Sequence, residues 1–209
     1  MPRCLTSLPP ADMSSSKYAA VFARFRSLLA LALMVFALSL LSHHFLTADN
    51  GWNILRQISV NLCLSIGMTL VILSGGIDLS VGAILALAGA VAAGLLKNGV
   101  ALPASGVTLE FTTAGAILAG LAVGGAAGWA NGFVITRFKL PPFVATLGMF
   151  SIARGLTMLW TGGFPITGLG DNFGYLGTGS FIGMPMPVWI MLALTGIFVV
   201  LTKRTRFGR

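Results

Sequence analysis

Long apolar runs joined by short polar links are the feature that most limits what this chain can fold into. A membrane-spanning helix needs about 20 apolar residues, and shorter runs must extend into flanking residues or sit inside a bundle. The runs lack the polar alternation that a transmembrane β-barrel needs. We therefore predict an all-α polytopic helical bundle with about six transmembrane helices. The predicted spans are residues 27–46, 58–74, 81–96, 113–136, 143–160 and 188–202.

Composition supports the same class. Hydrophobic residues make up 56% of the chain and charged residues only 9%, whereas a soluble domain carries about 25% charged residues. The net charge of +8 comes from short basic clusters between the apolar runs, a placement that sets membrane orientation rather than binding nucleic acid. The two cysteines, Cys4 and Cys63, have neither metal-ligand spacing nor a disulfide framework.

The distribution of Lys and Arg predicts the orientation. Four lie in residues 1–26, two in residues 137–139 and four in residues 203–209, whereas the link 161–186 has none. Because Lys and Arg concentrate in cytoplasmic segments, both termini are predicted to be cytoplasmic. The expected organisation is a leader (1–26), a transmembrane domain (27–202) and a basic tail (203–209), with the translation start open between Met1 and Met13.

A row of glycines marks the run 113–136. They recur at every fourth residue, which places them on one helix face and lets a neighbouring helix approach closely. Static packing is the preferred interpretation, and a moving interface is the alternative. The helix-packing glycines are Gly120, Gly124, Gly128 and Gly132.

Residues 74–80 are predicted to break the helical pattern. Gly75 and Gly76 weaken helix continuity, and Asp78 is an isolated acid that is costly at the centre of a bilayer. Asp78 or Ser80 can cap the next helix by accepting from its free N–H groups. The alternative is that the broken helix lines a solute path, as discontinuous helices do in transporters.

Polar residues inside the apolar runs are the candidates for such a path. Three of them recur at every fourth residue on one face of the run 58–74. They suit a path for hydroxyl-rich solutes, and they suit hydrogen bonding between helices equally well. The full set of pathway candidates is Asn61, Ser65, Thr69, Asp78, Ser80, Thr146 and Arg154.

Four stretches together resemble one family. They are residues 66–82 (IGMTLVILSGGIDLSVG), 140–157 (beginning LPPFVATLGM), 185–191 (PMPVWIM) and 205–209 (TRFGR). In this order and spacing they are similar to the permease subunits of bacterial ABC sugar importers of the ribose type. The resemblance runs from about residue 50 to the end of the chain, so residues 1–26 fall outside it.

The resemblance implies a multi-component importer in the bacterial inner membrane. Two permease subunits would form the pathway, a periplasmic sugar-binding protein would deliver the solute, and a separate cytoplasmic ATPase would supply the energy. The chain itself would be no enzyme and would need no cofactor, catalytic residue or metal. The sequence agrees in lacking Walker-type, His-Glu-x-x-His and Gly-x-Ser-x-Gly motifs.

The resemblance also implies that the chain matches only the N-terminal two-thirds or so of a permease. Family members continue into a cytoplasmic coupling loop, so we expect that this chain alone cannot couple ATP to import. A truncated product, a split-gene fragment and a partial record all stay open. So do the identity of the sugar and the choice between a homodimeric and a heterodimeric permease.

Two functions of other classes are alternatives to the permease. A non-transporting remnant or scaffold is the first alternative. An intramembrane enzyme is the second, but it would need a reactive pair within the bilayer, and Asp78 and Arg154 are the only internal charges. The sequence therefore favours the permease interpretation.

Overall fold

The structure is a computed structural model that describes residues 13–102 and 106–205, with side chains described from residue 25 onward except at 102 and 107. The chain divides into two compact units, Met1–Gly51 and Trp52–Arg209. Leader residues 1–12 and tail residues 206–209 lie outside the described residues. The helices are α1 (Met13–Leu41), α2 (Ala48–Leu73), α3 (Val81–Asn98), α4 (Thr113–Phe138), α5 (Pro142–Thr161), α6 (Asp171–Thr178) and α7 (Met186–Arg204).

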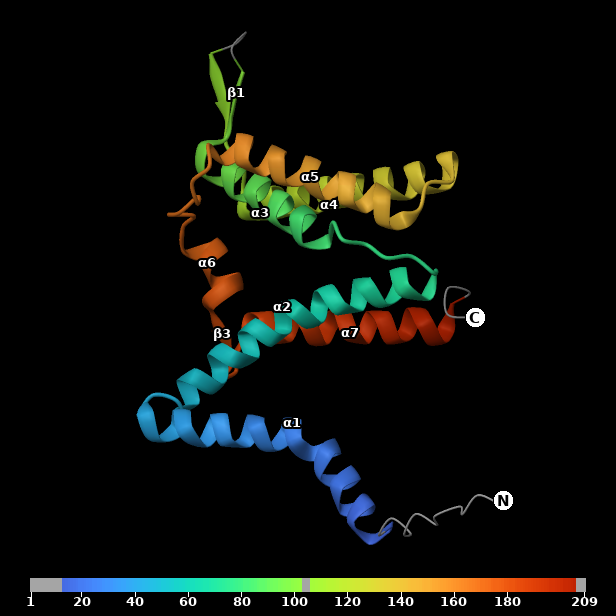
Figure 1. Cartoon of the computed structure of the whole chain (residues 1–209). Coiled ribbons are helices and arrows are strands. Elements are labelled where there is room, and N and C mark those ends of the chain that lie inside the picture. The colour runs from blue at the N-terminus through green and yellow to red at the C-terminus, as the bar shows by residue number, and fades with distance from the viewer. Residues whose placement is uncertain (1–12, 103–105, 206–209) are drawn as a thin grey trace, which may run out of the picture. The chain divides into compact units, whose positions relative to one another are not determined.

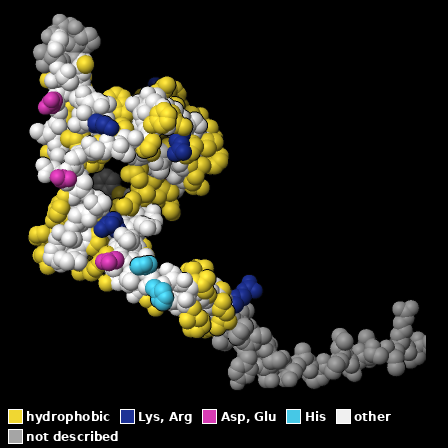
Figure 2. Space-filling model, turned by 90° about the vertical axis from the view of Figure 1, so that its left-hand side faces the viewer, with side chains coloured by type: hydrophobic (Ala, Val, Ile, Leu, Met, Phe, Trp, Pro, Cys, Tyr) yellow, Lys and Arg dark blue, Asp and Glu magenta, His cyan; other side chains and the backbone are white. Residues whose placement is uncertain are grey.

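Every predicted apolar run lies largely within a helix, which confirms the polytopic all-α class. Five described helices, namely α2, α3, α4, α5 and α7, are long and apolar enough to cross a membrane. The apolar part of α1 within the described side chains, Phe25–Leu41, is shorter. Broad hydrophobic areas are visible on the face seen in Figure 2. Many large apolar side chains of the described residues are exposed, and Leu159, for example, is 81% exposed. Such surfaces suit contact with lipid or with further helices.

The first unit shows why α2 begins well before the predicted residue 58. α1 ends at Leu41, and Thr47 then takes the N-cap position of α2. The Thr47 Oγ1 accepts a hydrogen bond from the Asn50 N–H at 3.3 Å, and the Asn50 side chain donates to the Phe45 carbonyl at 2.7 Å. Asp49 in the first turn further favours a helix start through the helix dipole.

The second unit is built around α3, which packs against both α4 and α5 (Figure 1). Ala83, Leu87 and Ala153 form a buried cluster where α3 meets α5, and the small alanines let the helices approach closely. Trp160 ties α5 to α3, because its indole N–H donates to the Ala90 carbonyl at 3.0 Å. The space for this indole comes from Gly94, where an added Cβ would lie 2.3 Å from Trp160 Nε1.

The glycine row of α4 divides into two halves. A Cβ added at Gly120 would lie 2.8 Å from the Ala88 carbonyl oxygen of α3, and one at Gly124 would touch Ala88 and Ile84 at 3.8 and 3.9 Å. Gly128 and Gly132 have nothing within 4 Å of such a Cβ among the described residues. The first half therefore permits the α3–α4 approach, whereas the second half borders open space.

Three small elements were not predicted from the sequence. β1 (Val100–Leu102) and β2 (Val107–Leu109) form an antiparallel hairpin, as do β3 (Ser180–Phe181) and β4 (Met184–Pro185). The third is α6, in the link 161–186. The Arg56 guanidinium of α2 donates to the Thr178 carbonyl at the end of α6 at 3.3 Å, and α6 also packs against α7. The link is thus a structured connection rather than a plain loop.

Replacing Gly120 with alanine tests the α3–α4 contact. Helix propensity alone favours Gly→Ala by up to about 1 kcal/mol. At Gly120, however, the new methyl group would push against α3 backbone, and overpacking costs about 1–3 kcal/mol. We therefore expect Gly120→Ala to lower the thermal unfolding midpoint in detergent. The matched control Gly128→Ala should leave the midpoint unchanged or raise it. Equal midpoints for the two variants would contradict the packing described above.

Candidate functional site

The predicted break at 74–80 is present, and glycine ends α2 in a specific way. Gly75 adopts a left-handed φ of +77°. Its N–H donates to the Ile72 carbonyl at 2.9 Å, and the Gly76 N–H donates to the Val71 carbonyl at 3.0 Å. This pair of bonds is a Schellman motif, which satisfies the last carbonyls of a helix and needs the left-handed residue that glycine supplies. The chain then runs without helix until α3 begins at Val81.

Asp78 organises the end of this segment together with Ser80. The Ser80 N–H and the Ser80 hydroxyl both donate to Asp78 Oδ1, at 2.7 and 2.6 Å. Ser80 is fully buried and occupies the N-cap position of α3. Its side chain nevertheless makes no capping bond to the α3 amides. Instead, Ser80 Oγ accepts a hydrogen bond from Asn131 Nδ2 of α4 at 2.9 Å.

Thr146 of α5 supports the break from the other side. Its side chain is 2% exposed. The Leu79 N–H donates to Thr146 Oγ1 at 3.3 Å, while the Thr146 hydroxyl donates to the Pro142 carbonyl at 2.8 Å and lies 3.3 Å from the Ile77 carbonyl. Thr146, on a helix distant in sequence, thus supplies a partner for the Leu79 N–H in a segment that has no helical hydrogen bonds of its own.

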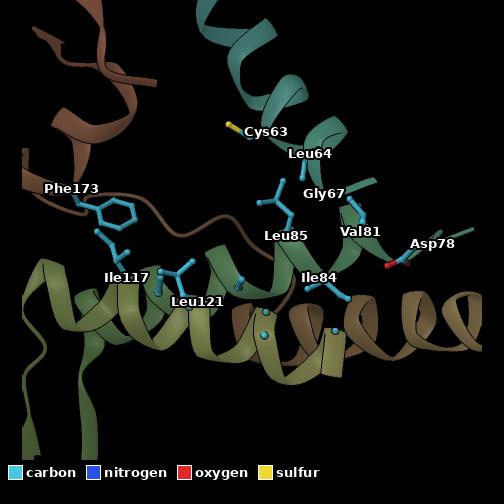
Figure 3. A pocket seen from close by; sticks show the side chains of 16 residues that line it. Cys63, Leu64, Gly67, Asp78, Val81, Ile84, Leu85, Ile117, Leu121 and Phe173 are labelled. Atoms are coloured by element: carbon cyan, nitrogen blue, oxygen red, sulfur yellow. The ribbon is translucent and has the colours of Figure 1, made fainter. Parts of the chain in front are cut away.

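A groove of about 510 Å³ begins at Asp78 (Figure 3). Its walls come from α2, α3, α4 and α6, and Asp78 is the only charged residue among those that line it within the described part of the chain. In the close-up, Asp78 and Phe173 stand toward opposite ends of the labelled lining. The walls are otherwise aliphatic side chains and glycines, including Leu85, Leu121 and Gly124. The site is therefore an apolar groove with one carboxylate at its end.

The predicted pathway residues separate into two groups. Asp78 lines the groove, and Ser80 and Thr146 form the buried support behind it. Asn61, Ser65 and Thr69 are exposed and do not line the groove. The hydroxyls of Ser65 and Thr69 donate to carbonyls four residues earlier in α2. Arg154 is likewise exposed on α5 and outside the groove.

Sequence reasoning missed Asn131. It is 6% exposed and is the one carboxamide in the run 113–136. A buried carboxamide must find hydrogen-bond partners, so this isolation was a usable signal. The glycine row of the same helix predicts helix packing but carries no information about this single carboxamide.

Comparison with known proteins identifies the family. Residues 51–209 match the model of a family described as "Branched-chain amino acid transport system / permease component". The chain belongs to this permease family. The resemblance inferred from the sequence motifs is thus confirmed at the level of the family, and the apolar helices of this permease are those of a multi-pass inner-membrane protein.

Curated relatives of this permease are named for ribose import and for D-allose transport. The chain is 43% identical to the ribose import permease protein RbsC of Bacillus subtilis (strain 168) over 183 residues, which are 87% of this chain and 53% of the relative. It is 42% identical to RbsC of Escherichia coli (strain K12) over 188 residues, 88% of this chain and 55% of the relative. The D-allose transport system permease protein AlsC of the same strain is 38% identical over 182 residues, 87% of this chain and 52% of the relative.

The chain therefore spans about half the length of these curated relatives. No solved structure matches it. Within this permease, the break at 74–80 is the place where polar groups from three helical segments meet, which makes it the candidate site.

Replacing Thr146 with valine tests the support of the break. Valine keeps the shape of threonine but leaves the Leu79 N–H without its acceptor, and an unsatisfied buried donor costs about 1–3 kcal/mol. We expect a lower thermal unfolding midpoint and faster proteolysis within residues 74–80. Thr146→Ser, which keeps the hydroxyl, is the matched control and should behave much more like the wild type. If serine and valine prove equally harmful, the loss lies in packing rather than in the hydrogen bond.

Proposed function

We propose that this chain is the membrane-spanning subunit of an ATP-driven ABC importer for a monosaccharide, forming part of the translocation pathway. Membership of the permease family supports transport. The 42–43% identity to ribose import permeases, together with the relative named for D-allose, supports a ribose-like sugar as the solute. The observation that carries the proposal is the broken helix, with Asp78 at the end of a groove between helices.

The chemistry of the groove suits a sugar. Its volume of about 510 Å³ lies within the range of about 300–1,000 Å³ that is typical of small-molecule sites. A monosaccharide presents hydroxyls at its edge and C–H groups on its faces. The Asp78 carboxylate accepts hydrogen bonds from the hydroxyls, and the aliphatic walls and Phe173 pack against the C–H faces. A discontinuous helix at such a place is a recurrent way of building a solute site in transporters.

Three partner proteins carry out the remaining steps of import. A second permease subunit completes the pathway, a periplasmic sugar-binding protein delivers the solute, and a cytoplasmic ABC ATPase provides the energy. Both termini of the chain lie in the cytoplasm. Asn61, Ser65, Thr69 and Arg154 stay predictions as pathway residues, because the groove does not include them.

Asp78→Asn tests the role of the carboxylate. Asparagine keeps an oxygen that can accept from Ser80 but removes the charge, and a hydrogen bond to a charged group contributes about 1.5–3 kcal/mol. We expect normal membrane insertion and a fall of about tenfold or more in the initial rate of radiolabelled ribose uptake by the complete importer in its host.

Asp49→Asn changes an acid in the first turn of α2 that does not line the groove. It is the matched control and should transport at the wild-type rate. Wild-type uptake by Asp78→Asn would show that transport does not need the charge of Asp78 and that this residue has a structural role only.

Reporter fusions test the proposed orientation. Because Lys and Arg concentrate in residues 1–26, 137–139 and 203–209, fusions after Arg26, Lys139 and Arg209 should report a cytoplasmic location. A fusion at Asp171 should report a periplasmic one. The measurement compares alkaline phosphatase activity, which needs the periplasm, with the fluorescence of a cytoplasmic reporter. A cytoplasmic signal at Asp171 would contradict the orientation.

A further inference from the structure

We infer that Asn131 of α4 is a positioning residue for the Asp78 carboxylate, acting through the hydroxyl of Ser80. The three side chains form a chain of contacts from Asn131 Nδ2 to Ser80 Oγ at 2.9 Å and from Ser80 Oγ to Asp78 Oδ1 at 2.6 Å. The inference rests on the proposed function in one respect only, namely that the Asp78 carboxylate binds the solute.

The number of available hydrogens determines which group donates in each of these two hydrogen bonds. An ionised carboxylate only accepts, so the single hydroxyl hydrogen of Ser80 goes to Asp78. Ser80 Oγ is then left as an acceptor, and the amide N–H of Asn131 is the donor that it meets. The opposite amide orientation would make Asn131 and Asp78 compete for one hydrogen. Only one arrangement therefore satisfies all three groups.

The position of Ser80 shows that its hydroxyl is diverted from its usual task. A serine at an N-cap normally accepts from the second or third amide of its helix. Ser80 makes no such bond and turns instead to Asp78 and Asn131. Both partners in the Asn131–Ser80 contact are buried, at 6% and 0% exposure, so water does not compete for it. The Ser80 hydroxyl thus binds the Asp78 carboxylate instead of capping α3.

These hydrogen bonds leave the second carboxylate oxygen of Asp78, Oδ2, available for a solute. Oδ1 is committed to the N–H and O–H of Ser80, while Oδ2 has no hydrogen-bond partner among the described residues. Asp78 lies at the end of the groove (Figure 3). A carboxylate held through one oxygen presents the other in a fixed direction, which lowers the ordering cost when a solute hydroxyl binds there.

The test is a double-mutant cycle in the complete importer, with two readouts. The variants are Asn131→Leu, which keeps a similar volume but cannot donate, Ser80→Ala, and the double variant. The first readout is the initial rate of radiolabelled ribose uptake. The second is the infrared carboxylate band of Asp78, found by subtracting the spectrum of the matching Asp78→Asn protein.

We expect Asn131→Leu to reduce uptake by about threefold to twentyfold, the range that interhelical hydrogen bonds in membranes span. We also expect it to shift the Asp78 carboxylate band. In the Ser80→Ala background Asn131→Leu should cause no further loss, because Asn131 acts through the missing hydroxyl. Asn98→Leu, an exposed asparagine at the other end of α3, is the matched control and should change neither readout.

Two results would overturn the inference. One is an unshifted Asp78 band in Asn131→Leu, which would make Asn131 a packing residue even if uptake fell. The other is a full additional loss in the Ser80→Ala background. If Asn131→Leu does not accumulate in the membrane, Asn131→Ser, too short to reach Ser80 in the same way, replaces it. A wild-type importer that takes up no sugar would count against the proposed function instead, since the band measurement needs no transport.

Discussion

The structure of the second unit depends on finding hydrogen-bond partners for the backbone between α2 and α3. A segment without helical hydrogen bonds is tolerated between membrane spans only when protein groups satisfy it or when it lines a cavity. Here the Leu79 N–H has Thr146 of α5, the Ser80 N–H has Asp78, and Ser80 is tied to Asn131 of α4. Because Thr146 lies on α5 and Asn131 on α4, two of these three contacts depend on the packing of α4 and α5 against α3.

The same packing creates the groove. Small residues on the contact faces, such as Ala88 opposite Gly120, bring α3 and α4 together at one end. Further along α4, Gly128 faces open space and forms part of the groove wall. Along this row, Gly120 therefore permits the close approach to α3, whereas Gly128 leaves open space beside the groove. Asp78 accepts hydrogen bonds from Ser80 of the break and also lines the groove. The break therefore has a structural role and a proposed functional role at the same residue.

Much of this was predictable, because hydrophobic length and glycine position are local properties. The start of α3 at Val81, the break at 74–80 and the spans of α4, α5 and α7 follow from apolar runs and from Gly75 at a left-handed position.

The early start of α2 was not predicted, since it depends on the cap formed by Thr47 in a polar stretch. The contact of Asn131 could not be predicted, because its partner Ser80 is 51 residues away along the chain and residue spacing gives no information on contacts at that separation. The stripe Asn61, Ser65 and Thr69 drew attention by its period, yet these residues lie outside the groove.

The native thiol of Cys63, which lines the groove from α2, offers the most direct test that this groove carries solute. The measurement is the rate at which a water-soluble maleimide labels Cys63 in the complete importer, with Cys4 replaced by serine. The account predicts labelling at rest and a clear fall in its rate when ribose, the binding protein and ATP are present together. In a Cys63→Ser background, a thiol introduced by Ser65→Cys, outside the groove, should show no such change. A labelling rate at Cys63 that stays the same during transport would contradict the central claim that the groove is part of the solute path.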